Sequence, residues 1–222
     1  MSDARADESM RKMQEFTFAY GFDHLRLLLW VIRQLAHGYP LTPQQVDQGI
    51  AELGIASDAA HQFLREVAER DADNQIIGAM GLSLSLSDHP HQMSVGSTLL
   101  SAWCALDTLF LPAMLQQTVT VTSPSPVNGE LILLKVSPER VVEVSPPNAV
   151  LSYMLIDPFQ SDLASVHALW GAFCCHIHFF GSHDEAERWI KGRTDIVVLT
   201  VEDGFALARQ MWSKALPDLY SE

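Results

Sequence analysis

Two groups of residues in this sequence could act together in a chemical reaction, and the first is a thiol beside a carboxylate. Cys104 and Asp107 interrupt the apolar stretch 99–112, whose large hydrophobic residues recur at helical spacing and predict a mostly buried helix. Residues three apart lie on one face of a helix, about a turn from each other. Burial disfavours the charged forms of both groups, so their presence is costly unless something uses them. From this stretch alone, a structural cysteine beside a capped or solvated aspartate is the favoured interpretation.

The second group is a run of four possible metal ligands: Cys174, Cys175, His176 and His178. Zinc is one candidate for such ligands. However, adjacent residues of an extended segment point to opposite faces, so the two neighbouring cysteines do not readily bind one ion, and CxxC spacing is absent from the chain. One of these thiols could instead join Cys104 and Asp107 in a site of two thiolates and one carboxylate. Such a site suits a soft metal that binds its ligands linearly, and the carboxylate could move a proton.

Composition and charge narrow the classes of function. The chain has 222 residues, of which 48% are hydrophobic and 18% charged, as is ordinary for a globular protein with an ample core. Its formal net charge of −13 argues against nucleic acid or an anionic membrane surface as a partner. The start of the chain shows no signal peptide, and the longest apolar run, 99–115, falls short of the ~20 residues of a membrane span. Three cysteines cannot all pair within one chain, so we expect free thiols in a reducing cytoplasm.

The order of the expected elements indicates an α+β protein. Helices are predicted over about 10–37, 43–53 and 57–67, and a hairpin with a strand through Leu86 is predicted within 74–86. Three helices and a hairpin are typical of a winged helix-turn-helix. We therefore expect an N-terminal three-helix, winged-helix-like module over 1–96. A core over 97–222 would follow, with a mixed β-sheet and surrounding helices.

Charge argues that this module does not bind DNA. Residues 42–70 include two basic and five acidic side chains, a net charge of −3, and a recognition helix needs a basic surface. The polar loop 87–96 is expected to link the module to the apolar stretch. His89 and His91 in this loop could bind a metal, but such histidines are more often solvated.

The second half of the chain is rich in strand signals separated by turns. Strands are predicted over 118–122, 130–136, 141–144, 150–156, 174–180 and 196–200, and helices over 161–170, 182–190 and 202–216.

Two segments resemble the signature segments of the organomercurial (alkylmercury) lyases: Ala102-Trp-Cys-Ala-Leu-Asp-Thr108 and Phe173-Cys-Cys-His-Ile-His-Phe-Phe180. The segments 136–139 and 203–208 are similar too, and the resemblance covers roughly the last two thirds of the chain well and the N-terminal helices more loosely. A cysteine and an aspartate in one segment, with a double cysteine in the other, are more specific than a single short motif. One departure is that the family usually carries a further cysteine in the following strand region, whereas 122–127 contains none. We expect this difference to affect local stability rather than chemistry.

The resemblance implies a role for each site residue. Cys104, Asp107 and Cys174 would form the catalytic trio and hold the Hg(II) product, and Cys175 would be a bystander. The reaction would be protonolysis of the carbon–mercury bond, giving a hydrocarbon and Hg(II) without an organic cofactor. Apolar burial would raise the pKa of Asp107, which would protonate the departing carbon. An exogenous thiol would free the Hg(II), which the family is understood to pass to a mercuric reductase.

Two other classes of function remain open. A metal-sensing winged-helix regulator would use Cys104 and Cys174 as sensor ligands without catalysis, but it would need a basic second helix, which the sequence lacks. A noncatalytic heavy-metal binder would keep the thiols without a proton donor, and the presence of Asp107 argues against it. The expected partners are an organomercurial and cellular thiols, with neither nucleic acid nor a membrane.

Overall fold

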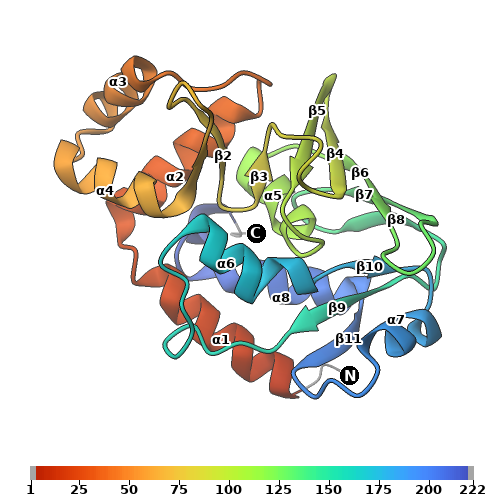
Figure 1. The fold of residues 1–222 in the computed structure, drawn as a ribbon. Helices are drawn as coiled ribbons and strands as arrows, with labels where there is room; N and C mark the ends of the chain where they lie inside the picture. The colour runs from red at the N-terminus through yellow and green to blue at the C-terminus, as the bar shows by residue number, and fades with distance from the viewer. Residues whose placement is uncertain (1–3, 220–222) are drawn as a thin grey trace.

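Alternation of buried and exposed side chains builds the larger of two sheets. The computed structural model describes residues 4–219 and has an α+β fold (Figure 1). The eight-stranded sheet has the order β1-β2-β3-β5-β4-β6-β7-β8. Its strands are β1 (Ala68–Arg70), β2 (Ile76–Ala79), β3 (Leu82–Ser83), β4 (His91–Val95), β5 (Thr98–Ala102), β6 (Val119–Pro124), β7 (Leu131–Val136) and β8 (Val141–Ser145). In β7, Ile132, Leu134 and Val136 are buried and the residues between them are exposed, which is the pattern of a sheet with one covered face.

A smaller, three-stranded sheet has the order β10-β9-β11. Its strands are β9 (Val150–Met154), β10 (Phe179–Phe180) and β11 (Ile196–Thr200). All strand pairs in both sheets are antiparallel, so the prediction of a mixed sheet is wrong. Neighbouring strands that run antiparallel do not need the helical crossover connection that joins a parallel pair.

The double-cysteine segment is mostly not a strand, contrary to the prediction for 174–180. Cys174–His176 forms a 3-10 turn, and strand pairing begins only at Phe179. The Ser152 hydroxyl explains the change, because it donates to the His176 carbonyl at 2.8 Å and accepts from the His178 amide at 3.0 Å. The Ser152 side chain thus adds two bonds to the backbone bond from the Ser152 amide to the His178 carbonyl, at 3.0 Å.

Four helices, rather than the predicted three, precede the first strand: α1 (Ala4–Phe18), α2 (Phe22–Leu35), α3 (Pro43–Leu53) and α4 (Ser57–Val67). The predicted helix 10–37 is interrupted at Gly21, whose φ of 82° lies in the left-handed region that favours glycine. Thr42 and Gln45 form a capping box at the start of α3, and Gly54 ends the helix, as the sequence predicts.

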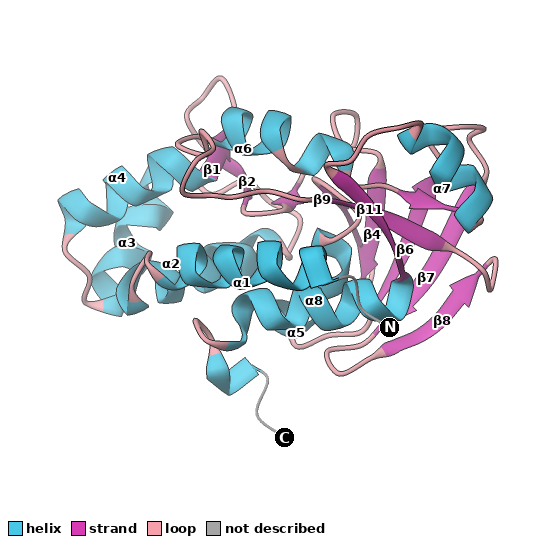
Figure 2. Cartoon of the chain, turned by 90° about the horizontal axis from the view of Figure 1, so that it is seen from below, coloured by secondary structure: helices cyan, strands magenta, loops and turns pink. Residues whose placement is uncertain are grey.

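Helix α1 lies against α8 (Val201–Ser213), which comes from the other end of the chain (Figure 2). The Thr17 hydroxyl donates to the Met211 carbonyl at 3.0 Å, and the Gln14 amide donates to the Gln210 carbonyl at 2.7 Å. These two bonds attach the N-terminal helix to the C-terminal part of the fold.

The apolar stretch that begins at Leu99 is a strand followed by a helix, so the prediction of one helix over 99–112 is wrong. Within β5, Leu99 is 46% exposed and Leu100 is fully buried, which is the alternation of a strand. The turn 103–106 follows, and α5 (Asp107–Leu115) is buried along its whole length. A segment that is apolar on every side carries no periodicity to separate helix from strand, and the pairing of β5 with β3 and β4 decides the outcome.

The predicted loop 87–96 contains strand β4, and this changes the setting of two histidines. His89 and His91 were expected to be solvated, but their exposed fractions are 9% and 0%. The hairpin strand predicted to extend through Leu86 ends at Ser83. Strand β4 begins at His91, which is buried where β4 pairs with β5 and β6, whereas residues 86–88 form an exposed turn between β3 and β4.

The remaining helices, α6 (Val166–Ala172) and α7 (His183–Ile190), lie within or close to predicted helical segments. Among residues 4–219, no helix is both long and apolar enough to cross a membrane. The division into 1–96 and 97–222 stays a prediction; β4 and β5, which lie on either side of it, pair with each other. Residues 1–3, on which the prediction of no signal peptide partly depends, lie outside the described part of the chain.

Candidate active site

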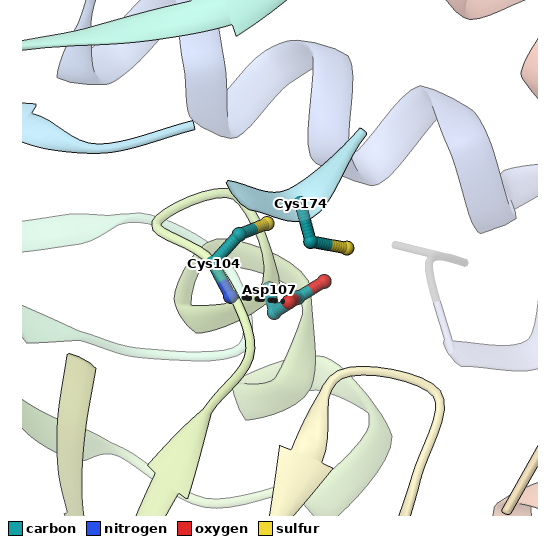
Figure 3. Close-up of side chains that lie close together, drawn as sticks. All are labelled: Cys104, Asp107 and Cys174. Carbon is teal, nitrogen blue, oxygen red and sulfur yellow. Dashed lines mark hydrogen bonds between the residues drawn. The ribbon is translucent and has the colours of Figure 1, made fainter. Parts of the chain in front are cut away.

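The structure brings three of the predicted site residues together in the protein interior (Figure 3). The sulfur atoms of Cys104 and Cys174 and a carboxylate oxygen of Asp107 all lie within 4.8 Å of one another. Cys104 lies in the turn after β5, Asp107 is the first residue of α5, and Cys174 begins the 3-10 turn after α6. All three side chains are buried. The arrangement offers two soft sulfur ligands and one proton-accepting group to a single small space.

Backbone hydrogen bonds fix the turn that carries Cys104. The Cys104 amide donates to Asp107 Oδ2 at 2.8 Å, and the next amide, of Ala105, donates to the Ile177 carbonyl at 3.1 Å. The first bond orients the carboxylate, and the second attaches the turn to the segment that follows Cys174. The two cysteines are therefore held together by the backbone near them as well as by side-chain packing.

Asp107 carries the pKa shift most relevant to proton transfer. Burial raises the pKa of its carboxyl group to about 6, although hydrogen bonds from the Cys104 thiol and amide, together with the charge of His89, act in the opposite direction. Its position in the first turn of α5 also favours the ionised form through the helix dipole. The group is thus ionised at neutral pH, yet it accepts a proton more readily than an ordinary aspartate.

Both thiols hold their protons more firmly than an ordinary cysteine does. Burial raises the pKa of Cys104 well above its usual range, and the contact with the Cys174 thiol raises it further. The same contact favours ionisation of Cys174, but burial and the nearby Asp107 still raise the pKa of its thiol overall. At neutral pH the free site therefore contains two neutral thiols and one carboxylate.

The other residues of the double-cysteine segment do not join this site. Cys175 is half-buried, and its thiol donates to the Gly171 carbonyl at 3.3 Å. His176 Nδ1 lies 3.3 Å from Arg193 Nη1, and His178 Nε2 hydrogen-bonds the Cys175 carbonyl at 2.9 Å. Within residues 4–219, one group of at least three cysteine, histidine, aspartate or glutamate side chains lies close enough together to hold one ion. It consists of Cys104, Asp107 and Cys174. The geometry thus gives no support to a zinc site built from neighbouring residues of this segment.

His89 and His91 are partners of structural groups rather than members of the trio. His91 Nδ1 hydrogen-bonds the Ser123 hydroxyl at 2.8 Å, and burial lowers the pKa of His91 to about 3. His89 Nε2 lies 3.0 Å from a carboxylate oxygen of Glu69. Ser123 belongs to the strand region in which the resembling family usually has a further cysteine, and here its hydroxyl is buried against an uncharged histidine.

An apolar cavity leads to the trio. Asp107 and Cys174 lie in the wall of an inner space of about 30 Å³, and an outer space of about 360 Å³ adjoins it. The residues common to both walls are Phe16, Tyr20, Met80, Trp103 and Leu169. Sequence analysis missed all of these lining residues except Trp103, because α1, the β2–β3 turn and α6 meet here through tertiary contacts that no short motif encodes.

Comparisons with known proteins identify first the fold and then the family. The crystal structure of the mercury-bound form of MerB2 has the same fold, with a TM-score of 0.74 at 23% identity, over 96% of this chain and 100% of that chain. The sequence model of the alkylmercury lyases matches residues 84–213. An alkylmercury lyase of Staphylococcus epidermidis (strain ATCC 12228 / FDA PCI 1200) is 35% identical over 184 residues, 83% of this chain and 80% of that protein. An alkylmercury lyase of Bacillus cereus is 41% identical over 184 residues, which are 83% of this chain and 79% of that protein. The chain belongs to the alkylmercury lyase family.

The buried carboxylate should make stability depend on pH. Because the folded-state pKa of Asp107 is raised from 3.8 to about 6, its contribution to stability falls as pH rises through this window. A shift of this size lowers the free energy of unfolding by roughly 3 kcal/mol at pH values above 6. Asp107→Asn, which keeps an oxygen acceptor for the Cys104 amide, should therefore be more stable than the native protein at pH 8. The gain should shrink toward zero near pH 4.

Urea unfolding of both proteins at several pH values measures this difference. Asp73→Asn is the matched control, because Asp73 is exposed and its substitution should give no pH-dependent gain. A stability difference between the native protein and Asp107→Asn that is the same at pH 4.5 and pH 8 would contradict the assigned burial cost.

Proposed function

We propose that this protein cleaves the carbon–mercury bond of organomercurials by protonolysis. The observation that carries the proposal is the buried trio of two thiols and one carboxylate within 4.8 Å of one another. Membership of the alkylmercury lyase family supports the same reaction, and so does the mercury bound by the structural relative MerB2. Cys104, Asp107 and Cys174 are the proposed catalytic residues.

The first step is capture of the substrate by thiol exchange. An organomercurial R–Hg–SR′ enters bound to a cellular thiol, and a cysteine sulfur replaces the SR′ group on mercury while a proton passes to SR′. Since both buried thiols are neutral, each must lose a proton to become an effective ligand. Asp107 is ionised at neutral pH and accepts the proton of the second thiol as the second mercury–sulfur bond forms.

The second step breaks the carbon–mercury bond. Two thiolates raise the electron density on mercury and weaken its bond to carbon, and the protonated Asp107 then donates its proton to that carbon. The products are R–H and Hg(II) held by both sulfurs. The two thiol protons end on R–H and R′SH, so the reaction balances without an oxidant or a reductant.

Release of the product completes the cycle. Two exogenous thiols replace the cysteine sulfurs on Hg(II) and return their protons to Cys104 and Cys174. No organic cofactor takes part in this scheme, and the freed Hg(II) would pass to a mercuric reductase. Such a cycle fits a cytoplasmic protein, because reduced thiols are abundant there.

The alternative functions account for fewer observations. A metal-sensing regulator would need a winged-helix-like module over 1–96 that binds DNA, but residues 42–70 have a net charge of −3, which does not suit DNA. A noncatalytic heavy-metal binder would need the two sulfurs alone. It would give no reason to bury a carboxylate with a raised pKa beside them.

Asp107→Asn should separate a lyase from a binder. Both sulfur ligands remain, so the variant should still bind about one Hg(II) per chain. The carbon–mercury bond should break on the order of 10²–10⁴-fold more slowly, because an amide cannot transfer the proton. Incubation with methylmercury and excess thiol, followed by gas chromatography of methane, measures the rate. Cys104→Ser is the control and should lose both capture and cleavage. Methane release by Asp107→Asn at the native rate would exclude Asp107 as the proton donor.

The neighbouring cysteines should differ sharply when each is replaced. Cys174→Ser removes a ligand of the trio and should abolish turnover. Cys175→Ser removes a thiol that hydrogen-bonds the Gly171 carbonyl outside the trio, so turnover should stay largely intact. The same methane assay compares the two variants. The reverse pattern would mean that Cys175 is the second mercury ligand.

A further inference from the structure

We infer that Gly81 is a positioning residue for proton transfer, because the absence of its side chain makes the space that holds the Asp107 carboxylate beside Cys104. The inference rests on the proposed function. Gly81 lies outside the residues matched by the family model, 84–213, and it carries no side-chain chemistry of its own. What it contributes is the close approach of a backbone to a buried carboxylate.

A side chain at position 81 would meet the Asp107 carboxylate at the oxygen that does not bond the Cys104 amide. A Cβ atom added at Gly81 would lie 2.7 Å from Asp107 Cγ and 2.8 Å from Oδ1, whereas the other oxygen, Oδ2, accepts the bond from Cys104. The carboxylate is therefore held between the backbone at Gly81 and the Cys104 turn. Any side chain at position 81 must displace either the carboxylate or the turn that carries it.

The turn at Gly81 is itself firmly anchored. Met80 and Gly81 join β2 to β3, with φ values of 40° and 97°, as in a tight two-residue hairpin. The Gly81 carbonyl accepts at 2.9 Å from the amide of Trp103, the residue before Cys104. Strand β3 also pairs with β5, which leads directly to Cys104. Because the turn is tied to the same strand as the thiol, the carboxylate is the part that must move.

The expected consequence is selective. Alanine at position 81 should push the carboxylate away from the reacting carbon while both sulfurs stay in place, since the Cys104 turn is also held by Ile177. Capture of mercury should survive and proton transfer should fail. A misplacement of the donating group by about 1 Å is enough to slow a proton transfer by about 10²-fold.

Gly129→Ala is the matched control for backbone strain. Gly129 also has a left-handed φ, of 76°, and lies between β6 and β7 of the same sheet, but a Cβ there would meet nothing within 4 Å. Gly81→Ala and Gly129→Ala therefore share the conformational cost, and Gly81→Ala alone adds the contact with Asp107. Single-turnover methane release from the cysteine complex of methylmercury, with mercury content after gel filtration, compares them. We expect at least about 100-fold slower release for Gly81→Ala with one Hg(II) still bound, and near-native release for Gly129→Ala.

A double-mutant cycle with Asp107→Asn tests whether Gly81 acts through the carboxylate. In that background the proton donor is already absent, so Gly81→Ala should cause no further loss of rate. An equal fold-loss in both backgrounds would overturn the inference, as would a native rate for Gly81→Ala with Asp107 present.

A second cycle uses stability and needs no activity, so it remains informative if Gly81→Ala folds poorly or if the proposed function fails. Asp107→Ala removes Cγ and Oδ1, the two nearest of the three Asp107 atoms that the new Cβ would meet, and leaves the Asp107 Cβ at 3.0 Å. Gly81→Ala should then lower the urea midpoint less in the Asp107→Ala background than in the native one. Equal shifts in both backgrounds would show that the contact is not the cause and would overturn the inference. Absence of methane from the native protein, with unequal midpoint shifts, would reject the lyase and leave the contact supported.

Discussion

Burial of one carboxylate beside two thiols is the constraint on which the rest of the structure depends. An ionised aspartate in an apolar interior is costly, and the fold offsets the cost with a single well-placed backbone donor, the Cys104 amide at 2.8 Å. That donor exists because the chain turns between β5 and α5. Every residue of α5, the helix that follows this turn, is buried, so the helix lies in the interior of the fold.

Segments distant in sequence close the space around this carboxylate. Helix α1 reaches it from one end of the chain and α8 from the other, and the bond between Thr17 and Met211 joins the two helices. The β2–β3 turn at Met80 and Gly81 forms a further wall. Asp107 and Cys174 are therefore almost fully buried, at 7% and 4% exposed, and burial in apolar surroundings strengthens the electrostatic influence of a charged group.

The sequence motifs predicted which side chains meet, but not the local structure that makes them meet. The resemblance pointed to Cys104, Asp107 and Cys174, and the structure places these residues together. The spacing argument that put the first two on one helix was wrong, because a uniformly apolar run has no period to distinguish strand from helix. The contact of Gly81 with Asp107 could not be predicted either, since it depends on the pairing of β3 with β5. Local signals predicted α3 and β11, where sequence neighbours determine the structure.

The raised thiol pKa values also bear on which metals suit the site. A metal must displace a proton from each buried thiol, and only a metal with very high affinity for thiolate offsets that cost. Hard cations prefer several oxygen ligands and would find one carboxylate in an apolar wall. Zinc prefers four ligands in a tetrahedron, and the described residues place three donors here. A soft ion that needs two sulfurs in line meets neither obstacle. Burial therefore raises the pKa of the carboxyl group and of both thiols together, and the same burial favours a soft metal over zinc and hard cations.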